Sequence, residues 1–208
     1  MIPKILHRVI PEQTTPLMDR SWESVQRLLP DWEHVTHYDN ERLPITGNYL
    51  RQCPHGAFRA DLIRLESLYI HGGVYLDSDI ELVKPIDHLL DTDFFAAREN
   101  ETAITNSVLG SIKGNKILIE AINLSVQVLR KNNFHIHPGA DRPIATPSGI
   151  AFGPYVMTEI HRAHPEITVL DTKLFFPYSY AERHDTDNKY PNDQEVLGVH
   201  RWAGSWRK

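Results

Sequence analysis

Two carboxylates, Asp77 and Asp79, stand one residue apart directly after the apolar run 74–76. The run has the length of a buried strand, and Gly72-Gly73 before it predicts a turn. In an extended backbone alternate side chains share a face, so the two carboxylates would lie roughly 6 to 7 Å apart. Like charges at that separation repel each other unless a cation lies between them. The pair therefore predicts a divalent-cation site; the alternative is a polar turn with solvated aspartates.

A second polar pair, Asp61 and Arg64, precedes the acidic pair. Apolar residues at 58, 62, 65 and 69 form one stripe at helical spacing, which predicts a helix over 56–71 with Gly72 as its C-cap. Residues three apart are neighbours on a helix surface. Read alone, the pair is an ordinary intrahelical ion pair. A carboxylate and a guanidinium can also bind sugar hydroxyls or a phosphate.

The chain resembles the DXD-containing sugar transferases of glycosyltransferase family 32. The resemblance is carried by three segments at fixed spacings: Arg59–Arg64, Leu68-Tyr69 and Gly72–Asp79. That family includes yeast initiating mannosyltransferases, bacterial capsular polysaccharide transferases and, more distantly, the glucosylating domain of large clostridial toxins. The resemblance implies an α/β fold with a single GT-A-type domain over residues 1–208, built on a mixed, mostly parallel sheet flanked by helices. It also implies a metal-dependent, retaining glycosyltransferase that moves a hexose from a nucleotide-diphosphate sugar to an acceptor.

Other segments carry the same resemblance. Segment 2–7 and Pro30-Asp31-Trp32 are similar to the family's opening, and 106–111 is similar to its asparagine-containing segment. Where the family commonly has a tryptophan that can stack on the base, this chain has Ile10. The end of the chain, from His200 to Ser205-Trp206, looks like the family's closing segment.

The resemblance implies a role for each matched residue. Asp79 would bind the metal, Asp77 would bind the ribose and the metal's water shell, and His200 would be a further ligand. An oxygen and imidazole shell suits Mn²⁺ better than Mg²⁺. The expected catalytic residues are Asp61, Arg64, Asp77, Asp79 and Asn106. The expected donor contacts are His7, Ile10, Asp61, Arg64, Tyr75, Asp77, Ser205 and Trp206.

The sequence leaves alternatives open for the role of Asn106 and for the retaining mechanism. Asn106 would face the donor sugar, or would cap a turn at a strand end. Retention could use a covalent intermediate or same-face attack, and the first requires a nucleophile near the anomeric carbon. Asp193 is a candidate for the active site, with a plain loop position as the alternative.

Composition limits the class of protein. The chain has 208 residues, 41% hydrophobic and 24% charged, which is typical of a globular domain. A net charge of −5 argues against nucleic-acid binding. Cys53 is the single cysteine, so an internal disulfide is excluded. There is no apolar run of 18 residues, and we expect no membrane span and either a cytoplasmic protein or a catalytic fragment of a longer one.

The remaining pattern predicts the elements that position these residues. Strand 4–10, a helix capped by Thr15 and ending near 29, and strand 32–38 form a β-α-β unit with parallel strands. We expect further strands at 80–82, 94–98, 168–170 and 174–176, and helices at 116–130 and 156–164. Loops 132–148 and 181–195 would contact the acceptor, a glycan, a lipid-linked sugar or a protein.

Two other functions are compatible with parts of the pattern. A haloacid-dehalogenase-type phosphatase also places Asp-x-Asp after a parallel strand, with the first Asp as nucleophile, but Ile80 follows the pair here and Arg64 would have no role. A non-catalytic sugar-nucleotide or glycan-binding protein would keep the fold without turnover, which the absence of the tryptophan at Ile10 favours.

Overall fold

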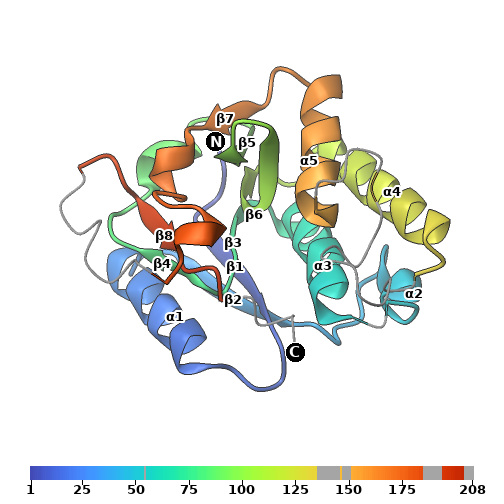
Figure 1. The fold of residues 1–208 in the computed structure, drawn as a ribbon, viewed down its shortest axis with the longest axis horizontal. Coiled ribbons are helices and arrows are strands. Elements are labelled where there is room, and N and C mark those ends of the chain that lie inside the picture. The colour runs from blue at the N-terminus through green and yellow to red at the C-terminus, as the bar shows by residue number, and fades with distance from the viewer. Residues whose placement is uncertain (54, 135–145, 147–150, 185–193, 204–208) are drawn as a thin grey trace.

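The computed structural model describes residues 1–53, 55–134, 146, 151–184 and 194–203. Its centre is a six-stranded sheet in the order β2-β1-β3-β6-β5-β7, beside a two-stranded sheet β4-β8 (Figure 1). The larger sheet is formed by β1 (Ile5–Ile10), β2 (Glu33–Tyr38), β3 (Gly73–Leu76), β5 (Phe94–Asn100), β6 (Ala103–Ser111) and β7 (Thr168–Leu170). The smaller one is formed by β4 (Ile80–Leu82) and β8 (Gly198–His200).

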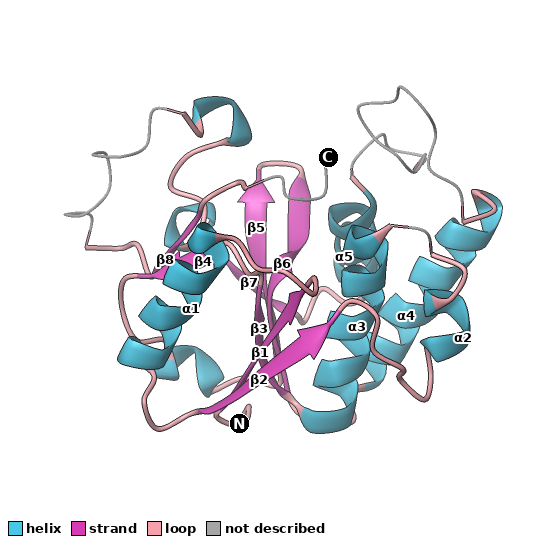
Figure 2. Ribbon diagram, turned by 90° about the horizontal axis from the view of Figure 1, so that it is seen from below, coloured by secondary structure: helices cyan, strands magenta, loops and turns pink. Residues whose placement is uncertain are grey.

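The helices cover both faces of the larger sheet. They are α1 (Pro16–Leu28), α2 (Gly47–Leu50), α3 (Gly56–His71), α4 (Lys116–Lys131) and α5 (Phe152–Ala163), with 3₁₀ turns at η1 (Asp87–Leu90), η2 (Thr172–Leu174) and η3 (Tyr180–Glu182). Figure 2 shows α1 and the β4-β8 pair on one side of the sheet and α2 to α5 on the other. This arrangement confirms the predicted mixed sheet flanked by helices.

Local chemistry explains why the first elements form where the sequence predicts them. The Thr15 hydroxyl accepts a hydrogen bond from Met18 N, and Pro16 occupies the first helical turn. Because α1 crosses over between β1 and β2, the two strands pair in parallel, with Ile10 opposite Tyr38. β3 joins β1 in parallel, and β6 runs antiparallel to both β3 and β5.

Two hydrophobic clusters enclose the sheet. One joins α3, α4 and α5 to the sheet around residues such as Leu65, Leu109 and Met157. The other lies on the α1 side and includes Leu76, Phe95 and Phe175. No helix among the described residues is long and apolar enough to cross a membrane.

Some predicted elements were wrong in kind or extent. Residues 174–176 do not form a strand, because η2 and the residues after it turn back on Thr172 through hydrogen bonds from Phe175 N and Phe176 N. Helix α5 begins at Phe152, four residues before the predicted start. Asn106 lies inside β6 and is not at a strand end.

Candidate active site

The acidic pair follows β3, whose four residues are all buried. Gly72 and Gly73 lead into the strand with φ of 71° and 106°, a region that favours glycine. After Leu76 the chain leaves the sheet: Asp77 N donates to Ser107 O at 2.9 Å, and Ile80 N donates to Asp77 O at 2.9 Å. The carboxylates thus project from a tight turn, which corrects the expected extended backbone.

His200 joins Asp77 and Asp79 from 120 residues further along the chain. β8 pairs antiparallel with β4, with His200 opposite Ile80. His200 Nε2 lies 3.4 Å from Asp79 Oδ1 and 3.8 Å from Asp77 Oδ2. One ligand atom from each of the three residues lies within 4.8 Å of the others. Two carboxylate oxygens and one imidazole nitrogen suit Mn²⁺ or another divalent transition metal, so the residues fit a cation at this position.

The electrostatics of the triad also fit a cation. Burial lowers the pKa of His200, but the carboxylates of Asp79 and Asp77 outweigh it and leave this pKa above its ordinary value. A positive charge is therefore favourable at this position. A divalent cation would supply that charge and leave the imidazole neutral to bind it.

Beside the triad, Asp61, Arg64 and Asn106 form a buried polar network. Arg64 Nη2 lies 3.2 Å from Asp61 Oδ1, and Arg64 Nη1 lies 3.0 Å from Asp77 Oδ1. Asn106 Nδ2 donates to Asp61 Oδ1 at 2.7 Å, and the Asn106 carbonyl accepts from Arg64 Nη1 at 3.0 Å. The structure therefore brings the predicted helix pair, Asn106 and the acidic pair into one connected cluster.

The network shifts the pKa values of its charged groups in different directions. Burial raises the pKa of Asp61 above its ordinary value, against the opposing effects of Arg64 and Asn106. The pKa of Asp77 is lowered, because Arg64, His200 and Tyr75 outweigh its burial. The pKa of Arg64 is raised by Asp77 despite burial. Asp77 is thus held ionised, as a group near a cation must be.

Three predicted donor contacts are buried in the structure. Tyr75 is 1% exposed, and its hydroxyl donates to Asp77 Oδ1 at 2.7 Å while Arg64 lies over its ring at 4.5 Å. His7 is fully buried, with Nε2 2.9 Å from Gly72 O and Nδ1 3.0 Å from His37 Nε2. Ile10 is 4% exposed. Tyr75 thus contacts the acidic turn after β3 and His7 contacts the glycine turn before it, and the roles of these two residues and Ile10 in binding the sugar nucleotide stay predictions.

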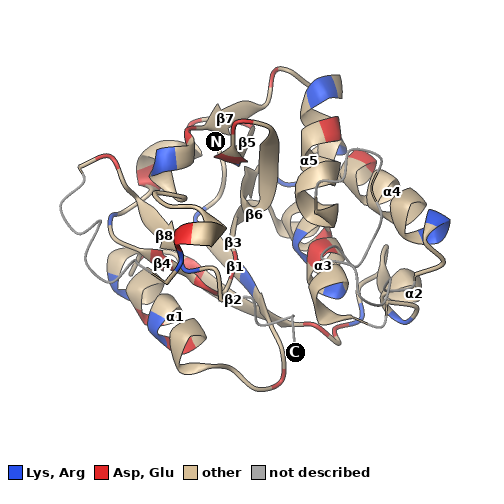
Figure 3. Ribbon diagram, in the orientation of Figure 1, with Lys and Arg blue, Asp and Glu red and all other residues tan. Residues whose placement is uncertain are grey.

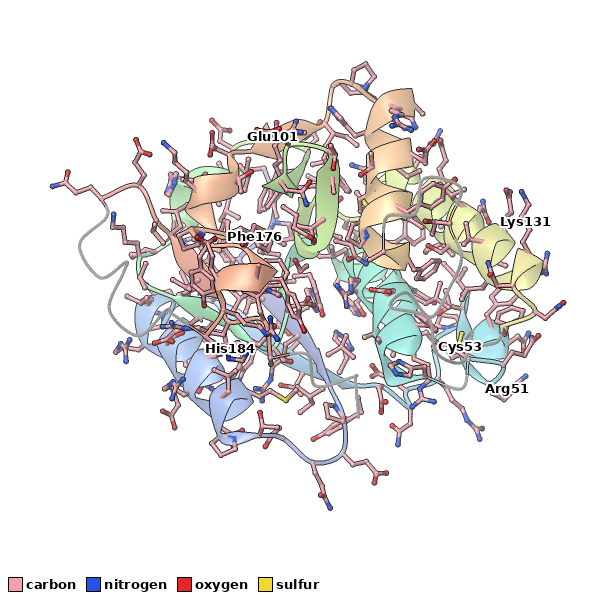
Figure 4. The ribbon with its side chains drawn as sticks, in the orientation of Figure 1. Arg51, Cys53, Glu101, Lys131, Phe176 and His184 are labelled. Atoms are coloured by element: carbon pink, nitrogen blue, oxygen red, sulfur yellow. The ribbon has the colours of Figure 1, made fainter. Side chains whose placement is uncertain are left out.

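Two further functional candidates lie near His200: Trp202, one of the two tryptophans of the closing segment, and Glu99, which the sequence did not single out. The Trp202 ring lies edge-on to His200, with ring centroids 4.3 Å apart, and Trp202 Nε1 donates to Tyr178 O at 3.1 Å. His200 also packs on Phe176, which Figure 4 labels beside the β4-β8 pair. Ser205, Trp206 and Asp193 lie outside the described residues.

Glu99, on β5, is the second candidate. Phe95 and Ala97 of this strand belong to the cluster on the α1 side, and the pairing of β5 with β6 is irregular on both sides of Arg98, the residue before Glu99. Burial raises its pKa, and it interacts electrostatically with His200 and Asp77. A single glutamate at a strand end gives no signal in the sequence, because the strand's neighbours decide which site it faces.

In the described part of the chain, charged residues outside the site do not form a second cluster of metal-ligating side chains. Figure 3 shows Lys and Arg interspersed with Asp and Glu over the helices and loops. Among the described residues, Asp77, Asp79 and His200 are the one group of metal-ligating side chains that converges in this way.

The mixed sheet flanked by helices, with a DXD turn at the end of a buried strand, is an arrangement of the GT-A type of fold. Residues 18–96 match the family described as the glycosyltransferase sugar-binding region containing DXD motif. This match confirms the resemblance seen in the sequence.

Curated relatives include yeast mannosyltransferases. The chain is 30% identical over 132 residues to inositol phosphoceramide mannosyltransferase 3 of Schizosaccharomyces pombe, covering 58% of this chain and 36% of that protein. It is 27% identical over 144 residues to mannosyl phosphorylinositol ceramide synthase CSH1 of Saccharomyces cerevisiae, covering 64% and 37%. The chain thus spans little more than a third of the length of these relatives.

Solved structures share the fold at low identity. The PaToxG glycosyltransferase has a TM-score of 0.57 at 18% identity, covering 78% of this chain and 70% of that chain. The galactosyltransferase LgtC, solved with donor and acceptor sugar analogues, has a TM-score of 0.53 at 12% identity, covering 94% and 86%. These likenesses support the GT-A type of fold.

Proposed function

We propose that this chain is a metal-dependent, retaining glycosyltransferase that moves a hexose from a nucleotide-diphosphate sugar to a hydroxyl-bearing acceptor. The proposal rests on the contact between two groups of residues. The first is the triad Asp77, Asp79 and His200, and the second is the buried network Asp61, Arg64 and Asn106. They meet where Arg64 Nη1 lies 3.0 Å from Asp77 Oδ1. The first group suits a cation and a diphosphate, and the second suits sugar hydroxyls.

Different residues would bind the cation and the sugar. Asp79 and His200 would hold the cation directly, with Asp77 completing the carboxylate side. When bound, a divalent cation neutralises the diphosphate and stabilises its departure as a Lewis acid. Arg64, held by Asp61, Asp77 and the Asn106 carbonyl, keeps the two carboxylates at a set separation. Asp61 is left to accept a hydrogen bond from a sugar hydroxyl.

Burial supports transfer over hydrolysis. Arg64 is 5% exposed, Asp79 9% and His200 8%, so little water reaches these side chains. Water exclusion strengthens electrostatic interactions and protects the donor from hydrolysis. Trp202 adds an apolar wall against His200.

The contacts of Asp77 argue against the phosphatase alternative. Its Oδ1 accepts from Tyr75 and pairs with Arg64, and its Oδ2 faces His200. In that alternative Arg64 would have no role, whereas here Arg64 pairs with Asp77 Oδ1 in a buried network. Only a measurement of turnover distinguishes the proposed glycosyltransferase from a non-catalytic sugar-nucleotide or glycan-binding protein.

The test is a panel of GDP- and UDP-hexoses with Mn²⁺, in which release of the nucleoside diphosphate is measured with and without candidate acceptors. GDP-mannose comes first, because one curated relative is named a mannosyltransferase and another a mannosyl phosphorylinositol ceramide synthase. We expect slow hydrolysis of one donor and its loss in Asp79→Asn, with Asp91→Asn, an exposed aspartate away from the site, as the control. Tight binding of a sugar nucleotide without turnover would select the non-catalytic function. Full activity in Asp79→Asn would contradict the proposed one.

A further inference from the structure

Gly153, the second residue of α5, packs its backbone against the side chain of Asn106. A Cβ at position 153 would lie 2.4 Å from Asn106 Oδ1 and 2.5 Å from Asn106 Nδ2. Real Cβ atoms essentially never show contacts below 3.0 Å. Gly153 is not among the glycines with positive φ. Space, and not backbone conformation, therefore requires glycine at this position.

Asn106 has little freedom to move away from such a side chain. It is 6% exposed and lies inside β6, against which α5 packs. Its side-chain Nδ2 donates to Asp61 Oδ1 at 2.7 Å, and its backbone carbonyl accepts from Arg64 Nη1 at 3.0 Å. A side chain at 153 would push the Asn106 amide out of its contact with Asp61.

Asp61 depends on that contact for its orientation. Its contacts with Asn106 and Arg64 both use Oδ1, and its side chain keeps 14% exposure. The second oxygen is the one that these contacts leave to accept from a ligand hydroxyl. Rotation of the carboxylate would therefore misplace the acceptor atom that the proposed function assigns to the donor sugar.

We propose that Gly153 is a positioning residue for the donor-sugar site. A side chain at this position would fill the space that Asn106 occupies, and Asn106 orients the Asp61 carboxylate. This inference rests on the proposed function. It makes the first turn of α5 part of the site, although α5 contributes no polar side chain to the network described above. Misplacement of a contact by about 1 Å can reduce turnover on the order of 100-fold.

The test is a double-mutant cycle of Gly153→Ala and Asn106→Ala, with Gly47→Ala as control. Gly47 has no atom within 4 Å of a Cβ and no positive φ. We measure kcat/KM with the sugar nucleotide that the wild-type chain turns over, the thermal midpoint, and the Asn106 side-chain amide resonance by ¹⁵N NMR. We expect Gly153→Ala to lose about 10- to 100-fold in kcat/KM and the double variant to be no worse than Asn106→Ala.

The readouts separate this inference from the proposed function. A shifted Asn106 amide resonance in Gly153→Ala supports the positioning role even if no donor is turned over by the wild type. If Gly153→Ala does not fold, recovery of a folded state in the double variant, from which the clashing side chain is gone, supports it equally. The inference is overturned if Gly153→Ala has an unshifted Asn106 amide resonance and a wild-type kcat/KM. It is also overturned if the loss of kcat/KM in the double variant is the product of the losses in the two single variants.

Discussion

Arg64 Nη1 lies 3.0 Å from Asp77 Oδ1, and the Arg64 side chain is 6% exposed. The same guanidinium pairs with Asp61, so it balances two carboxylates in a buried cluster. Removal of one partner from a buried ion pair leaves an uncompensated charge.

We therefore expect Arg64→Met to lower the free energy of unfolding by about 3 to 5 kcal/mol and to abolish turnover. Urea unfolding monitored by circular dichroism measures the first effect. Arg20→Met is the control, because Arg20 is exposed and lies 4.0 Å from its nearest partner, Glu81. Equal stability of the two variants would mean that the cluster is not held by its charges.

Asp79→Asn should weaken Mn²⁺ binding on the order of 100-fold, because it removes a charged oxygen that faces His200. Isothermal titration with Mn²⁺ in the presence of a nucleoside diphosphate gives the affinity. The Asp79 backbone carbonyl would still accept from Arg201 N, so we expect the fold to survive. Unchanged affinity would place the cation elsewhere.

His7 makes stability depend on pH. Burial lowers its pKa from 6.5 to about 4, so the folded chain holds it neutral while the unfolded chain protonates it below pH 6.5. The stabilisation is complete above that pH and is lost as the pH falls towards 4, on the order of 3 kcal/mol in total. Urea titrations at pH 7.5, 5.5 and 4.5 measure it. In His7→Asn this part of the pH dependence should vanish, and an identical slope in both proteins would contradict the assignment.

Gly73→Ala should destabilise the chain by more than about 2 kcal/mol. Its φ is 106°, and a Cβ would lie 2.4 Å from the carbonyl oxygen of Ile5 in β1. Gly47→Ala, where a Cβ meets nothing, should be nearly neutral. Thermal unfolding compares the two, and similar midpoints would show that the turn before β3 tolerates a side chain.

The acidic pair and the helix before it could be predicted because their signals are local. Thr15 was predicted to cap the start of α1 and Gly72 to end α3, and the structure confirms both. The crossover through α1 likewise predicted that β1 and β2 are parallel.

Other features depend on partners that lie far away in the sequence. His7 precedes Gly72 by 65 residues, and only the structure shows that its ring contacts the Gly72 carbonyl. Asn106 lies inside β6, whose extent depends on its pairing with β3 and β5, which come from distant parts of the chain. The space that Gly153 leaves, and the face on which Glu99 lies, are properties of packing between elements, which no local pattern encodes.

His200 reaches the acidic turn on a strand of three residues that is paired to another strand of three residues. Strands this short have little stability of their own. A ligand that binds His200 together with Asp79 would therefore hold β8 against β4, so that ligand binding and the ordering of β8 become one coupled equilibrium. Occupancy of the site should then be visible as slower amide exchange along β4 and β8.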